Sequence, residues 1–267
     1  MQHPVTPDSA GGPSSRRPRV RLRVLAALVV HVVLLLPIIS NPPSAAAGNV
    51  AGMTVVLDPG HNGIADPSNS RQVPNGRGGS KECNTSGTAT ADGYPEHSFT
   101  WDVAQRVRDA LDGLGVRTTL TRDSDNGVGP CVDQRAAVAN AAKPDAIVSI
   151  HADGGPPSGR GFHVNYSSPP LNDAQGAPTL ALATRMRDAL AAAGLQESNY
   201  AGGQGLYGRA DLAGLNFAQY PAVLVELGNM KNADDAAQME SADGRAKYAA
   251  AVTQGITNYL SNNGPSH

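Results

Sequence analysis

Two patterns of hydrophobic residues alternate along the chain; one predicts strands and the other predicts helices. Continuous runs of β-branched and aliphatic residues that stop near Gly or Pro predict buried strands. Apolar residues spaced three or four positions apart predict helices. Strands are expected at 54–57, 116–121, 146–150, 161–166 and 221–227. Helices are expected from Glu96 to Leu114, and at 134–142, 180–193 and 246–260.

The alternation of strands and helices defines the expected fold. Connections of this kind are typical of a mostly parallel sheet with helices on both of its faces. We therefore predict a single α/β domain built on a mostly parallel, twisted central β-sheet. The segment 62–95 is rich in Gly, Ser, Asn and Thr without clear periodicity, and it is expected to be a long loop. Loops of that length within a compact domain are usually functional or mobile.

The start of the chain follows a different pattern. Five arginines within residues 16–23 precede an apolar run at 24–39, and an Ala-x-Ala sequence follows at 45–47. This order is typical of a secretory signal peptide. The run is shorter than the roughly 20 residues of a stable membrane span. We expect residues 1–47 to be cleaved off, with an uncleaved anchor as the alternative, and we expect no membrane span in the exported protein.

The remaining chain is expected to hold one domain at 48–262 and a flexible tail at 263–267. Without the signal peptide it carries 16 basic and 22 acidic residues, a net charge of −6. Such an acidic domain has no electrostatic basis for binding nucleic acid. Its length suffices for one substantial core. We expect the protein to be a monomer.

The chain contains two cysteines, Cys83 and Cys131, and neither belongs to a Cys-x-x-Cys motif. An even number of cysteines in an exported protein favours disulfide formation. We expect one disulfide between them, with two free thiols as the alternative. The bond would tie the long loop to the segment that precedes the helix at 134–142.

Four polar residues lie where predicted strands end or a helix begins. His61, His151 and Glu226 lie at or near the ends of three strands, and Glu96 opens the first helix. Ligand sites of parallel sheets lie outside the carboxyl ends of the strands, so these side chains are expected to converge. Two imidazoles and a carboxylate are a common ligand set for catalytic zinc. We hypothesise that His61, Glu96 and His151 bind Zn²⁺.

Glu226 is the candidate acid/base. It lies among apolar neighbours in Val223-Leu224-Val225-Glu226-Leu227, where burying a carboxylate is costly. Zinc lowers the pKa of a bound water to about 7, and a general base is still needed to take the water proton. We predict that Glu226 takes this proton and passes it to the leaving nitrogen.

Each of these residues also has a purely structural interpretation. A loop histidine such as His61 is often a surface residue, and the helix dipole alone would favour Glu96 in a first turn. His97 is a rival ligand, but adjacent helical residues point about 100° apart, so His97 and Glu96 do not easily face one metal. His163 is expected to be a packed or partnered strand histidine.

Several sequence blocks follow one another over nearly all of the mature chain. They are Val56-Leu57-Asp58-Pro59-Gly60-His61, Glu96, Thr121-Arg122-Asp123 with Asp125 and Arg135, Ala139-Asn140, Ser149-Ile150-His151-Ala152-Asp153, and Pro221-Ala222-Val223-Leu224-Val225-Glu226-Leu227-Gly228. In these blocks the sequence resembles the zinc-dependent N-acetylmuramoyl-L-alanine amidases of cell-wall remodelling and daughter-cell separation.

The resemblance implies both the site and the substrate. It implies that His61, Glu96 and His151 are the zinc ligands and that Glu226 is the catalytic acid/base. The implied substrate is peptidoglycan or a muropeptide, cut at the amide that joins the lactyl group of N-acetylmuramic acid to the L-alanine of the stem peptide. The protein would then act in the periplasm, in the cell wall or outside the cell.

Two other functions compete with this one. A metallopeptidase would cut within the stem peptide, and its products would differ because only an amidase frees a sugar without peptide. A non-catalytic module that binds the cell wall would keep the fold alone. The presence of all three candidate ligands together with Glu226 argues against such a module, since binding alone does not require a buried carboxylate.

Overall fold

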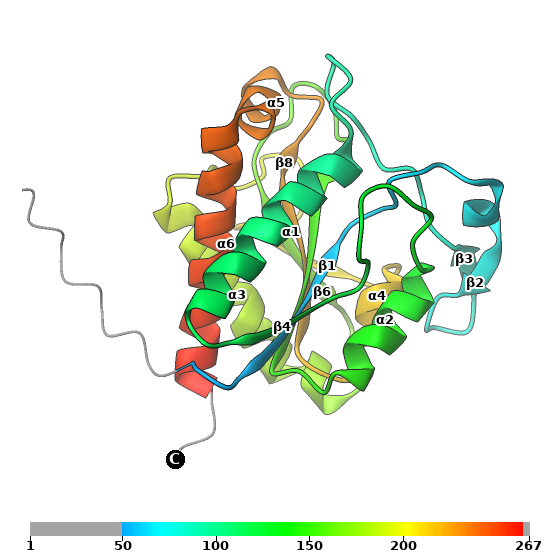
Figure 1. Cartoon of the computed structure of the whole chain (residues 1–267), viewed down its shortest axis with the longest axis vertical. Coiled ribbons are helices and arrows are strands. Elements are labelled where there is room, and N and C mark those ends of the chain that lie inside the picture. The colour runs from blue at the N-terminus through cyan, green and yellow to red at the C-terminus, as the bar shows by residue number, and fades with distance from the viewer. Residues whose placement is uncertain (1–49, 264–267) are drawn as a thin grey trace, which may run out of the picture. The chain divides into compact units, whose positions relative to one another are not determined.

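A computed structural model describes residues 50–263 of the 267-residue chain (Figure 1). Six strands form the central sheet in the order β4-β1-β5-β8-β6-β7. Their bounds are β1 (Thr54–Pro59), β4 (Arg117–Leu120), β5 (Ala146–Asp153), β6 (His163–Ser167), β7 (Leu206–Arg209) and β8 (Ala222–Asn229). The first four strands in this order run parallel, β6 runs antiparallel to β8, and β7 runs parallel to β6. The prediction of a mostly parallel sheet in an α/β domain is confirmed.

Helices cover both faces of the sheet (Figure 1). One face is packed by α1 (Glu96–Gly113), α3 (Ala177–Ala192) and α6 (Ala242–Asn263), and α5 (Ala233–Glu240) packs against α6. The opposite face carries the shorter helices α2 (Val132–Ala141) and α4 (Ala213–Phe217). The large apolar core lies on the first face and a much smaller cluster lies on the second.

The two faces of the sheet differ in chemistry because strand side chains alternate. Val55, Val148 and Val225 point into the large core and are fully buried. Asp58, which follows the core residue Leu57, and Glu226, which follows Val225, point to the opposite face and line a cavity together with residues of α2 and α4. Strands that are largely apolar in sequence therefore have a second face that carries some polar side chains. The site described below lies on that face.

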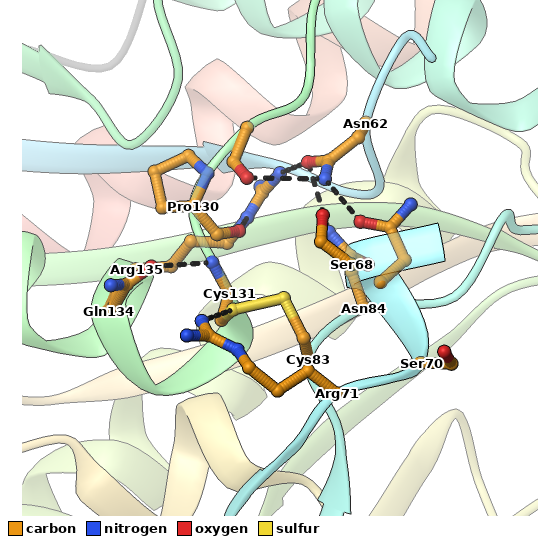
Figure 2. Close-up of a disulfide and its surroundings, with 12 residues drawn as sticks. Asn62, Ser68, Ser70, Arg71, Cys83, Asn84, Pro130, Cys131, Gln134 and Arg135 are labelled. Carbon is orange, nitrogen blue, oxygen red and sulfur yellow. Dashed lines mark hydrogen bonds between the residues drawn. A yellow bond between two sulfur atoms is a disulfide. The ribbon is translucent and has the colours of Figure 1, made fainter. Parts of the chain in front are cut away.

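The segment 62–95 is more ordered than predicted. It contains the 3₁₀ helix η1 (Pro67–Ser70) and a small antiparallel hairpin of β2 (Gln72–Pro74) and β3 (Ser80–Glu82). The expectation of one long loop without regular structure is wrong, because these elements are too short to give a periodic pattern. Cys83, directly after β3, forms the expected disulfide with Cys131 (Figure 2).

Other differences concern short elements and ends. β7, α4 and α5 were not predicted, since each is short and lacks both a run of β-branched residues and a repeated helical spacing of large apolar residues. The last helix begins at Ala242, four residues before its predicted start. The predicted signal peptide and residues 264–267 of the predicted tail lie outside the described residues. Within residues 50–263, no helix is long and apolar enough to cross a membrane.

Candidate metal centre

The carboxyl edge of the sheet gathers the four predicted site residues. His61 lies two residues after β1, and Glu96 is the first residue of α1. His151 was expected directly after its strand but lies within β5, which continues to Asp153. It is paired in register with Glu226 on β8, so the two side chains are direct neighbours. All four residues line one cavity of about 360 Å³.

Three of these side chains meet closely. Glu96 Oε1 lies 3.0 Å from His61 Nε2 and 3.1 Å from His151 Nδ1. All three candidate ligand atoms lie within 4.8 Å of one another. Tetrahedral zinc with bonds of about 2 Å holds its ligand atoms roughly 3.3 Å apart. The three donor atoms are therefore close enough together to bind one metal ion, and two imidazoles with one carboxylate form a donor set that suits zinc.

The carboxylate of Glu96 is held in place by backbone amides, and the two histidines favour its ionised form. Its side chain accepts hydrogen bonds from the amides of Thr88 (3.0 Å) and Ala152 (3.1 Å). Burial raises the pKa of Glu96, but hydrogen bonds from His151 and His61 outweigh burial, and the pKa lies well below its ordinary value. The position at the start of α1 also favours a negative charge. Glu96 is therefore ionised at neutral pH.

His61 is oriented by its second ring nitrogen. Nδ1 lies 2.9 Å from the carbonyl oxygen of Thr85, which leaves Nε2 facing Glu96. A hydrogen bond from the other ring nitrogen to a carbonyl is a common feature of metal-binding histidines. Burial lowers the pKa of His61, but the hydrogen bond and charge of Glu96 raise it above its ordinary value overall.

The backbone at His61 is also held in place by two arginine side chains. His61 adopts a φ of 65°, which is uncommon for residues other than glycine. The buried guanidinium of Arg135 donates to the carbonyl oxygens of Pro59 (2.6 Å) and His61 (2.5 Å). Arg122 donates to the carbonyl oxygen of Pro59 as well, at 3.1 Å. These contacts hold the loop after β1 in the conformation that presents the imidazole.

Two glycines make room for the cluster. A Cβ atom on Gly60 would lie 2.3 Å from Cε1 of His151. A Cβ atom on Gly87 would lie 2.7 Å from Oε2 of Glu96. Real Cβ atoms do not come this close to other heavy atoms, so the cluster as it stands requires glycine at both positions.

Glu226 lies beside the cluster without joining it. Its Oε2 atom is buried and has no hydrogen-bond partner among the described residues. Burial raises the pKa of Glu226 well above its ordinary value, the charges of Glu96 and Asp153 add to this, and Arg209 opposes it. A carboxylate with a raised pKa is a stronger proton acceptor, which suits a general base.

The other two candidate histidines lie apart from the cluster. His97 Nδ1 contacts Asp125 at 2.9 Å, and His97 is not among the clustered residues. His163 is 2% exposed and packs against the rings of Tyr200 and Tyr207, in agreement with the expected packed histidine.

Sequence reasoning gave no role to Arg135 or Arg122, although both belong to the blocks behind the resemblance. The structure shows that they support the backbone of the loop after β1. In the sequence, Arg135 is recognisable only as a single arginine within an Ala-rich helix. No periodic pattern distinguishes such a buried arginine from an exposed one.

Fold and cluster together define a class of protein: an α/β domain with two imidazoles and a carboxylate gathered at the carboxyl edge of its sheet, beside a second carboxylate. Residues 55–258 match the N-acetylmuramoyl-L-alanine amidase family, which is about three quarters of the chain. The chain belongs to that family.

Individual relatives agree with this assignment. The chain is 60% identical over 235 residues to the N-acetylmuramoyl-L-alanine amidase Rv3717 of Mycobacterium tuberculosis, covering 88% of this chain and 97% of the relative. The crystal structure of the amidase Ami1 from Mycobacterium smegmatis has 62% identity and a TM-score of 0.80, covering 81% and 100% of the two chains. Apo Ami1 from Mycobacterium abscessus has 64% identity and a TM-score of 0.78, covering 79% and 99%.

Proposed function

We propose that this amidase uses a zinc ion bound by His61, Glu96 and His151 to hydrolyse the amide between the lactyl group of N-acetylmuramic acid and the L-alanine of the stem peptide. Glu226 is the proposed acid/base. The observation that carries the proposal is the cluster of three ligand atoms within 4.8 Å, open to a cavity that Glu226 also lines.

The donor set supports zinc over harder cations. Two imidazole nitrogens and one carboxylate oxygen suit Zn²⁺, whereas Mg²⁺ and Ca²⁺ prefer sites made of oxygen ligands. When bound, zinc supplies Lewis-acid chemistry that polarises a carbonyl group and makes water more acidic. Two of the proposed ligands are oriented by the backbone. The carbonyl of Thr85 contacts His61, and the amides of Thr88 and Ala152 donate to Glu96.

Glu226 would move the proton. Its place opposite His151 in the sheet puts its carboxylate beside the cluster and at the wall of the cavity. There it accepts a proton from the attacking water and delivers it to the nitrogen of the departing L-alanine, so that the peptide leaves as a neutral amine. Its raised pKa favours the first transfer and keeps the proton available for the second.

Glu226→Gln tests this assignment. We expect the variant to lose about 10³-fold or more in kcat, within the range typical of a lost acid/base, and to keep one zinc ion per chain. Turnover would be followed by mass spectrometry of digested muropeptides, and zinc by elemental analysis. Glu240→Gln is a matched control, because Glu240 is the last residue of α5 and does not line the cavity.

The products and the metal are tested in the same assay. An amidase releases a sugar without peptide and a peptide with a free L-alanine amine, and a chelator should abolish both products until zinc is restored. Fragments cut within the stem peptide would instead identify a metallopeptidase. A Glu226→Gln variant with near-normal turnover would remove Glu226 from the mechanism.

We also propose that the protein is exported and acts on the cell wall. The support is the order of basic, apolar and small residues before Ala47, together with the wall substrate of the family. Sequencing the amino terminus of protein recovered from outside the cytoplasm should give Gly48 as the first residue. A terminus that retains the apolar run would indicate an uncleaved anchor.

A further inference from the structure

Two buried polar atoms without partners belong to residues that face each other in the sheet. They are Nδ1 of His163 and Oε2 of Glu226, and neither has a hydrogen-bond partner among the described residues. β6 runs antiparallel to β8, and His163 is paired directly with Glu226. Directly paired residues point to the same face, with Cβ atoms about 4.5–5.5 Å apart. The two side chains therefore lie side by side, although no direct hydrogen bond joins these two atoms in this structure.

The ring of His163 is held in place by two aromatic side chains. The rings of Tyr200 and Tyr207 lie 6.1 Å and 5.9 Å away from centroid to centroid, at 89° and 62°. Burial lowers the pKa of His163 to about 4, so the ring is neutral at the pH of most cellular compartments. A neutral imidazole has one N–H donor and one acceptor. His163 can therefore donate to a carboxylate without adding a charge.

Two other donors near Glu226, Tyr200 and Arg209, already have partners. The hydroxyl of Tyr200 donates to Asp153 at 3.0 Å. The guanidinium of Arg209 donates to both carboxylate oxygens of Asp211, at 2.8 Å and 2.6 Å. The charge of Arg209 lowers the pKa of Glu226, but neither Arg209 nor Tyr200 is hydrogen-bonded to it. Among the buried side-chain atoms without a partner in the described residues, Nδ1 of His163 is the one that belongs to a residue paired with Glu226.

We propose that His163 is a positioning residue for Glu226. Its Nδ1–H donates to one bound water that in turn donates to Oε2 of Glu226, and this bridge fixes the rotation of the carboxylate. The other oxygen is then kept toward the cavity, where it exchanges the proton with the attacking water and the leaving nitrogen. This inference rests on the proposed role of Glu226 and goes beyond it by naming the group that orients it.

Two substitutions at His163 separate hydrogen bonding from packing. His163→Leu removes the donor, and His163→Asn keeps an amide group near the position of Nδ1. We expect the Leu variant to lose about 10- to 100-fold in kcat, the range typical of lost supporting hydrogen bonds at metal sites, with little change in KM or zinc content. The Asn variant should recover most of the loss.

Asn165→Leu is the matched control. Asn165 lies two residues along the same strand, is 1% exposed and also has a buried atom without a partner, but it faces Leu224 instead of Glu226. We expect its kcat to stay near that of the wild type at a temperature where all variants are folded. If Asn165→Leu loses as much kcat as His163→Leu, packing of the strand explains the effect and the inference is overturned.

A measurement without turnover completes the test. In the full chain labelled with ¹⁵N-histidine, the Nδ1 resonance of His163 should shift when Glu226 is replaced by Gln. An unchanged resonance would overturn the inference even if the Leu variant fails to fold. Wild-type kcat in His163→Leu, with Glu226→Gln inactive, would overturn the role of His163 and leave that of Glu226 intact. An active Glu226→Gln enzyme would overturn both roles.

Discussion

At the scale of single residues, the metal centre depends on small neighbours as much as on its ligands. The ligand types were readable from the sequence because histidine and glutamate at strand ends and helix starts are chemically distinctive. Gly60 belongs to the sequence blocks that resemble the amidase family, but only the structure shows why this position has no side chain. Its α-carbon faces the ring of His151, a residue 91 positions later in the chain.

Replacing Gly60 with alanine tests this contact. The new Cβ would lie 2.3 Å from Cε1 of His151, so the ring must move away from Glu96. We expect zinc affinity to fall about 10- to 100-fold, as it does when the support of a ligand is lost. Competition with a chromogenic chelator measures the affinity. Gly113→Ala is the control, because nothing lies within 4 Å of its added Cβ; equal affinities would contradict the prediction.

At the scale of elements, the disulfide connects the hairpin segment to the start of α2 (Figure 2). Cys131 is the N-cap of α2, and the amide of Val132 donates to the carbonyl oxygen of Cys83 at 2.8 Å. Arg71 donates to the sulfur of Cys131 at 2.9 Å. Two residues beyond Cys83, Thr85 provides the carbonyl oxygen that orients His61. The bond therefore anchors the segment that supports a candidate ligand.

Removing the disulfide should weaken the whole domain. In the chain-entropy description, a link between residues 48 positions apart contributes about 4 kcal/mol to the free energy of unfolding. We expect Cys83→Ala/Cys131→Ala to lose an amount of this order in urea denaturation with chelator present. The reduced wild-type protein is the control and should match the variant. A variant as stable as the oxidised protein would show that the bond does not constrain the unfolded chain.

At the scale of the whole molecule, one carboxylate joins four parts of the fold. Asp58 at the end of β1 accepts hydrogen bonds from Arg135 on α2 (2.8 Å), from Ser149 on β5 (2.6 Å) and from Thr121 directly after β4. Burial raises the pKa of Asp58, but the charge of Arg135 and these hydrogen bonds outweigh it and lower the pKa to about 2. Folding is therefore coupled to the ionisation of Asp58.

This coupling predicts acid sensitivity. A pKa that is lower in the folded state than in the unfolded state gives stability that is present above about pH 4 and is lost as the pH falls toward 2. The shift from 3.8 to about 2 corresponds to about 2.5 kcal/mol. We expect the stability gap between wild type and Asp58→Asn to narrow by most of this amount between pH 5 and pH 2 in urea titrations with chelator.

Asp109→Asn is the control for this titration. Asp109 lies on α1 and its side chain is 72% exposed. Its substitution should leave the pH dependence of unfolding as in the wild type. A gap between wild type and Asp58→Asn that stays constant with pH would show that ionisation of Asp58 does not contribute.

The sequence by itself determined the principal strands and long helices, the α/β class and the residue types of the candidate centre. Those features depend on local periodicity and on side-chain chemistry, which are readable within a few consecutive positions. Hydrophobic patterns predicted the bounds of β5 and α1 to within a few residues. The order of the sequence motifs along the chain indicated the family. The small hairpin and β7 were missed because these short strands lack the runs of β-branched and aliphatic residues that mark the predicted strands.

Only the tertiary structure decided which distant residues face each other. The antiparallel direction of β6 brings its first residue, His163, opposite Glu226 near the end of β8. In a parallel arrangement the start of β6 would lie at the far edge of the sheet. Strand direction and register arise from pairing between segments more than 50 residues apart, and no local pattern encodes them. The support of His61 by Arg135 and the need for Gly60 depend on the same long-range packing.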